Sequence, residues 1–237
     1  MASRNASFHE GVLAGVLLGP FKLVFAVAMG FVGILVLAWI VDWVFVFRVW
    51  PEGVERLKQV LAADLADGMD LAVRQGWTGE MISSTANGLY GVIFRATGIH
   101  DMGMRFAEGA ALSIPDTVVR SAYIANRDAI EVAMTGTQLI GVRVATLVLA
   151  VPLLVLIYVV AISDGLTERA IRRAAGGRES ASLYHRAKHM QVAVIGTAVV
   201  AFLVWPAPLE WGRVGPLLAP ALGVLGRMQW AYYKKHA

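Results

Sequence analysis

The residues best suited to chemistry lie in one basic segment, 164–189, between two apolar runs. His185 and His189 are one helical turn apart, a spacing that can chelate a metal ion, but the segment offers neither a third ligand nor the glutamate of an HExxH motif. The residue types of a hydrolytic triad are also present, at Asp164, Ser180, Ser182 and His185. No nucleophile elbow or oxyanion hole accompanies them, and the chain has no cysteine. The sequence therefore predicts no enzyme, no metal site and no cofactor.

The same segment favours binding to a partner or to lipid. It carries six Lys or Arg residues, and arginine forks pair bidentately with carboxylates, whereas clusters of positive charge beside a membrane also hold anionic lipid. No aromatic stacking platform accompanies these charges, so we expect no direct contact with nucleic acid. The predicted contact residues are Arg172, Arg173, Arg178, Glu179, Ser180, Tyr184, His185, Arg186 and Lys188.

Two opposite charges lie in the apolar runs themselves. Asp42 falls near the end of the first run and Arg143 near the start of the second, at matching depth if both helices cross a bilayer. Because an unpaired charge at that depth costs a few kcal/mol, the two side chains are predicted either to form an ion pair or to reach separately to the interface.

The composition explains where these residues must be placed. The chain has 237 residues, of which 57% are hydrophobic and only 16% charged, and the apolar residues occur in long uninterrupted runs. This pattern predicts an all-α membrane protein with about four transmembrane helices and a helical extracytoplasmic segment. Gly11, Gly15 and Gly19 share one helix face, which is compatible with self-association or with a short interfacial helix.

The positive-inside rule sets the orientation. The basic segment is short and is expected in the cytoplasm, which puts both termini there and the long first connection outside. The predicted order is a cytoplasmic segment 1–22, a transmembrane helix 23–47, a periplasmic segment 48–138, a transmembrane helix 139–163, a basic cytoplasmic loop 164–189, transmembrane helices 190–205 and 214–231, and a cytoplasmic tail 232–237.

Local patterns predict helices in both connecting segments. In the outer one, a helix is expected after Pro51, with Val54, Leu57, Leu61 and Leu65 on its apolar face. Further helices are expected over Ile82–Ala96 and from Pro115 onward without a break into the second span. In the cytoplasmic one, Asp164 is expected to cap a basic helix that ends at Gly176-Gly177. The outer helices are predicted to pack together or to contact a partner.

Several sequence elements, in the order in which they occur along the chain, resemble those of a known family. The elements are Trp50-Pro51-Glu52, the stretch Gly88–Gly98, Arg143 before a long apolar span, the 164–188 loop, Pro206 and Pro208, and the terminal Lys234-Lys235. The chain resembles the integrating conjugative element membrane protein family over nearly its whole length, most specifically in the loop. Asp42-Trp43 stands where Glu-Trp is expected in relatives, a departure that keeps the acid.

The resemblance implies a multi-pass protein of the bacterial inner membrane, encoded among conjugation genes and without catalytic residues. The expected function is that of an accessory component of a conjugative DNA-transfer system of the type IV secretion kind, acting as scaffold or partner of the coupling ATPase. The alternative is a small membrane channel or regulator that uses Asp42 and Arg143 as functional charges.

Overall fold

The computed structural model describes residues 3–107, 114–176 and 181–233, and every regular element in those ranges is a helix. The elements are α1 (Ser3–Val44), the π-helical turn η1 (Phe45–Val49), α2 (Val54–Arg74), α3 (Glu80–Tyr90), the π-helical turn η2 (Gly91–Arg95), α4 (Ile99–Ala107), α5 (Ile114–Ala125), α6 (Arg127–Ala174), α7 (Ala181–Val204) and α8 (Trp211–Ala231). The predicted all-α class is confirmed.

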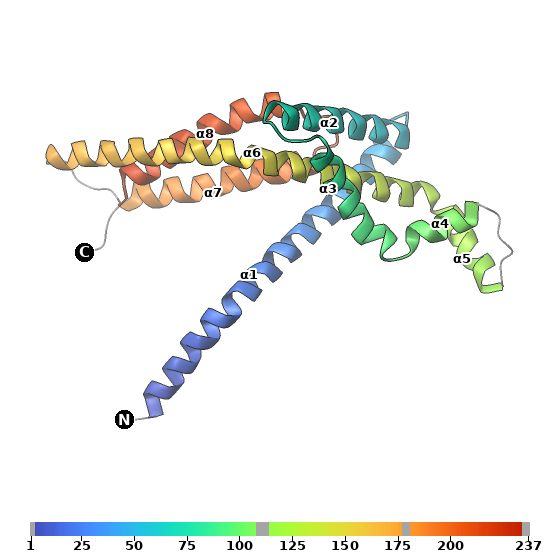
Figure 1. Cartoon of the computed structure of the whole chain (residues 1–237), viewed down its shortest axis with the longest axis horizontal. Helices are drawn as coiled ribbons and strands as arrows, with labels where there is room; N and C mark the ends of the chain where they lie inside the picture. Colours follow the sequence, from blue (N-terminus) through green and yellow to red (C-terminus); the bar gives the residue numbers. More distant parts are fainter. Residues whose placement is uncertain (1–2, 108–113, 177–180, 234–237) are drawn as a thin grey trace.

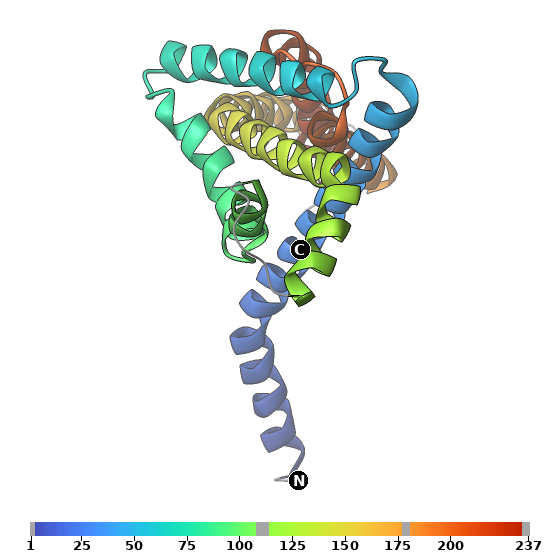
Figure 2. The same cartoon turned by 90° about the vertical axis from the view of Figure 1, so that its right-hand side faces the viewer.

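The central element is α6, a helix of 48 residues. At 1.5 Å per residue it is about 72 Å long, roughly twice the thickness of a bilayer's apolar core. Its first half packs against α1, α2 and α3, and its second half lies beside α7 and α8 (Figure 1). Figure 2, which looks toward the end where α6 begins, shows α2 and α3 on two sides of it. The helix α6 is therefore the shared packing partner of α1, α2, α3, α7 and α8.

Three glycines of α6 allow three different helices to approach it closely. A Cβ built on Gly136 would lie 2.5 Å from an Asp42 carboxylate oxygen of α1. One on Gly141 would lie 2.6 Å from the Ala86 Cα of α3, and one on Gly165 would lie 2.6 Å from the Arg227 carbonyl of α8. Because no larger side chain fits at these contacts, the glycines set the spacing between α6 and its neighbours.

The amphipathic helix α2 lies along the first half of α6. Its buried residues are Leu57, Val60, Asp64, Gly68 and Ala72, which recur every three or four residues and so form one face. Leu57 and Val60 pack against Val132 and Leu139 of α6, whereas Ala72 packs against the next turns of that helix. Burial of these apolar side chains holds α2 and α6 together.

Three helices are long and apolar enough to cross a membrane: Phe21–Val49, Arg127–Ala174 and Ser182–Val204. They match the first three predicted spans. The fourth predicted span is the helix α8, which contains Pro216 and Pro220 and is not among the three. Many apolar side chains remain exposed on these helices, among them Phe25 of α1 and Leu156 and Val160 of α6.

Several predicted boundaries change in the structure. Asp164 does not cap a helix, because α6 continues through it to Ala174, although a left-handed glycine, Gly176, does follow the helix end as predicted. The helix expected from Pro115 is interrupted at Asn126, where α5 gives way to α6. The helix α4 was not predicted, and α1 extends from Ser3 beyond the expected start of the first span.

Candidate functional site

A buried ion pair lies where α2, α6 and the connection between α7 and α8 meet. The Arg143 side chain is 1% exposed, and its Nε donates to Asp64 Oδ2 at 2.7 Å. Its two other nitrogens donate to carbonyl oxygens at the end of α7 and just after it, those of Leu203, Trp205 and Ala207. Arg143 therefore neutralises Asp64 and also satisfies carbonyl groups that a helix end leaves without partners.

Carboxylates of α2 bind the other side of this connection. The Leu209 N–H donates to Asp64 Oδ1 at 2.9 Å, and the Trp211 N–H, at the start of α8, donates to Asp67 Oδ2 at 2.9 Å. The first N–H groups of a helix have no partner within the helix, so Asp67 acts as a cap supplied by a distant element. Together, Asp64, Asp67 and Arg143 fix the turn between α7 and α8.

The predicted ion pair between Asp42 and Arg143 is not formed, because Arg143 binds Asp64 instead. Asp42 is only 3% exposed and lies against Gly136 of α6. No Lys or Arg side chain of the described residues lies within 4 Å of its carboxylate. Near it, the Trp39 indole donates to Thr137 Oγ1 at 3.1 Å and joins α1 to α6.

Sequence reasoning missed Asp64 because it placed the apolar face of α2 about one residue away, on Val54, Leu57, Leu61 and Leu65. A usable signal was present in the four-residue spacing of Val60, Asp64, Gly68 and Ala72. Small residues in such a row indicate close packing against another helix, and an aspartate in that row requires a buried partner.

Two opposing influences act on the Asp64 carboxyl group. Burial raises the pKa of Asp64 above its ordinary value, while the Arg143 guanidinium and the Leu209 N–H act to lower it. Burial is the larger effect, as expected for a carboxylate removed from water.

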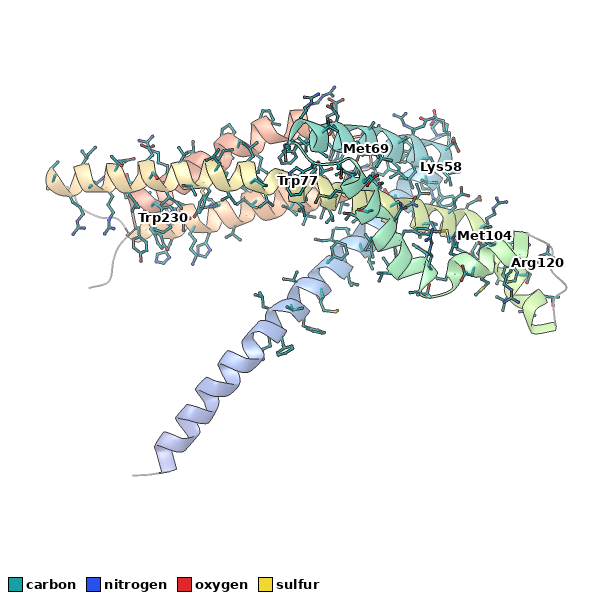
Figure 3. The ribbon with its side chains drawn as sticks, in the orientation of Figure 1. Lys58, Met69, Trp77, Met104, Arg120 and Trp230 are labelled. Carbon is teal, nitrogen blue, oxygen red and sulfur yellow. The ribbon has the colours of Figure 1, made fainter. Side chains whose placement is uncertain are left out.

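The predicted contact residues fall at the opposite end of the molecule, where α6 and α8 end and α7 begins; Trp230, labelled in Figure 3, lies in this region. Arg172 is used internally there. It donates to the Ala231 carbonyl at 3.1 Å, pairs with Glu168 of its own helix, and lies over the Tyr232 ring at 4.1 Å. Its removal would disturb the packing of α8 on α6.

Aromatic rings join the same three helix ends. Tyr184 of α7 packs edge-on against Tyr233, which also contacts Trp230. The Trp230 indole N–H donates to Tyr158 Oη at 3.2 Å. Tyr and Trp clusters of this kind are typical of the boundary between a membrane and water.

The remaining predicted contact residues divide into two groups. Arg173, His185, Arg186 and Lys188 have exposed side chains. Arg178, Glu179 and Ser180 lie outside the described residues. The exposed positive charges therefore lie on the same helices, α6 and α7, that contribute Tyr158 and Tyr184 to the aromatic cluster.

Comparison with known proteins identifies the family. Neither the curated proteins nor the solved structures gave a match. A family model described as IncC plasmid conjugative DNA transfer protein DtrJ-like matches residues 49–229, which is well over half of the chain. This range includes α2 to α7, nearly all of α8, the buried ion pair and the basic end. The chain belongs to the DtrJ-like family of conjugative DNA transfer proteins.

Proposed function

We propose that the chain is an accessory, non-catalytic protein of the bacterial inner membrane that serves a conjugative transfer machine, as in an integrating conjugative element. Its basic cytoplasmic end would bind a subunit such as the coupling ATPase of the type IV system. Membership of the DtrJ-like family supports the link to transfer, and three helices of sufficient length and apolarity support the location.

The docking proposal rests on the placement of the basic residues at this end: two make contacts that hold helices together, and several others have exposed side chains. Arg172 and Arg227 are occupied by Glu168, Asp164 and the end of α8. Arg186 and Lys188 are exposed near the start of α7, and the Arg173 side chain is exposed at the end of α6. Exposed positive charges on helix ends that internal contacts hold in place suit a partner with an acidic surface.

Transfer frequency tests this proposal. Alanine at Arg173, Arg186 and Lys188 together should lower conjugative transfer by at least tenfold, while the amount of protein in the membrane stays normal. The matched control removes three exposed arginines elsewhere, Arg56, Arg74 and Arg213, and should leave transfer near the wild-type level. Normal transfer by the first variant would refute docking through the basic end.

A photo-crosslinker can identify the partner. It belongs at His185, whose side chain is exposed, because Tyr184 is packed against Tyr233. A covalent adduct with a transfer ATPase or a channel subunit would support the proposal. An adduct with lipid alone would leave these charges as determinants of membrane orientation.

A further inference from the structure

The helix α1 diverges from α7 and leaves a groove between them. The two helices meet near Val204, and from there α1 runs away from the α6–α8 bundle (Figure 1). The groove has a volume of about 710 Å³, within the range of about 300–1,000 Å³ for sites that bind small molecules. Its lining includes Val41 and Phe45 of the first membrane-length helix, Gly196, Val200 and Val204 of α7, and Trp205.

The walls of this groove suit a hydrocarbon chain. They are formed almost wholly by apolar side chains of two helices that are long enough to cross a membrane. A Cβ built on Gly196 would meet nothing within 4 Å, so the groove is open above that residue. Neither Asp42 nor Arg143 lines it.

A lining residue of the groove, Trp205, and a residue close in sequence to another, Arg48, suit a phosphate headgroup. Arg48 follows the lining residue Phe45 by three positions, at the end of the π-helical turn, and its side chain is exposed. No carboxylate of the described residues lies within 4 Å of it. Trp205, at the same end, is 53% exposed. A cation and an indole beside an apolar slot are the features found at headgroup level.

A second groove along α7, which shares Ala201 and Trp205 with the first, provides a comparison. It measures about 410 Å³ and is also apolar, with Ala198, Phe202 and Leu218 in its wall. Arg213, in the first turn of α8, precedes the lining residue Val214 in the sequence. Its Nε lies 2.9 Å from Glu210 Oε2, so the two side chains form an ion pair. Its charge is therefore already balanced, whereas Arg48 remains available for an anion.

We propose that the groove between α1 and α7 binds one anionic phospholipid, with an acyl chain between the helices and the phosphate at Arg48. The lipid would fill the space left by the divergent α1 and hold that helix at a fixed angle. This inference rests on the proposed membrane location.

The test uses the full-length protein in nanodiscs of phosphatidylglycerol and phosphatidylcholine, with a phosphatidylglycerol that carries a photoreactive acyl chain. Crosslinked peptides should come mainly from residues 41–45 and 196–204. Gly196→Trp, which fills the groove, should reduce this labelling several-fold. Val160→Trp, at an exposed position of α6, is the matched control and should not.

The headgroup contact is tested separately. Arg48→Gln should lower the preference for phosphatidylglycerol over phosphatidylcholine about fivefold, the scale of one basic residue at an anionic surface. Arg213→Gln, beside the second groove, should leave it unchanged. The helical circular dichroism of each variant shows whether it is folded.

Two outcomes would overturn the inference. Labelling spread evenly over the exposed faces of α6 and α7 would mean ordinary surrounding lipid only. Labelling unchanged by Gly196→Trp in a folded variant would exclude the groove. Failure of the chain to enter nanodiscs at all would instead refute the membrane location.

Discussion

Arg143 connects more parts of the chain than any sequence pattern around it suggests. Its guanidinium joins Asp64 of α2 to three carbonyl groups near the end of α7. A positive charge at the carboxyl end of a helix is favourable, and the pairing with Asp64 offsets part of the cost of burying that charge. With all these partners in place, Arg143 serves to hold helices together, which argues against a mobile charge in a channel.

Loss of Arg143 should have a pH-dependent effect on stability. Arg143→Met leaves Asp64 buried without its partner, so the pKa of Asp64 should rise further. A carboxyl group with a raised pKa keeps its proton in the folded state at pH values where the unfolded chain has lost it. Stability therefore falls as the pH rises from about 3.8 through the folded-state pKa.

We expect this variant to lose about 3–5 kcal/mol at pH 8 and clearly less at pH 5, where Asp64 can stay protonated. Thermal unfolding in mild detergent, followed by circular dichroism, measures the difference. Arg74→Met, at an exposed position of α2, should show no such dependence. An equal loss of stability at both pH values would mean that protonation of Asp64 does not compensate for the loss of Arg143.

At the scale of elements, the fold depends on close approach along α6. Gly136, Gly141 and Gly165 each face a different helix, and in each case the nearest atoms leave no space for a methyl group. Each neighbour contributes a matching small or polar surface, such as Ala86 of α3. The spacing between helices is therefore set by backbone contact and less by large interlocking side chains.

A pair of glycine substitutions tests this contact. Gly141→Ala should destabilise the protein by about 1–3 kcal/mol, because the new methyl group would meet the Ala86 backbone. Gly88→Ala of α3 meets nothing within 4 Å and should be neutral or slightly stabilising, since alanine favours a helix. The change in thermal unfolding temperature compares the two. Equal effects would show that α3 is not held at Gly141.

The whole molecule is polarised along α6. One end carries α4 and α5, with Met104 labelled there in Figure 3, and the other carries the aromatic and basic cluster around Trp230. In Figure 1, the first turns of α1 and the last turns of α8 both lie on the left, as does the end of α6 that carries basic residues. The predicted orientation, in which both termini share one side of a bilayer with the basic segment, stays a prediction.

Cysteine labelling can test that orientation without background, because the chain has no cysteine. Met104→Cys and His185→Cys both introduce thiols at exposed positions, at opposite ends of the molecule. A membrane-impermeant maleimide should label the first in intact spheroplasts and the second only after lysis. Labelling of both before lysis would refute the proposed topology.

The sequence by itself determined the helical class, three apolar segments of spanning length and the concentration of basic residues at 164–189. These features depend on composition and on short periodic patterns, which each segment carries alone. The helix over Ile82–Ala96 and the glycine after α6 were predictable for the same reason. The break at Asn126 and the continuation of α6 past Asp164 were not, because packing along a long helix outweighs weak local preferences.

Only the tertiary structure decided which charges meet. Asp64 and Arg143 are 79 residues apart, and the carbonyl groups that complete the site come from a third segment, so no local spacing relates them. Asp42 had the matching depth but faces Gly136, because the direction of its side chain follows from how α1 rotates against α6. In the same way, Arg172 is only 20% exposed because the end of α8 lies against it, whereas the Arg186 side chain is exposed.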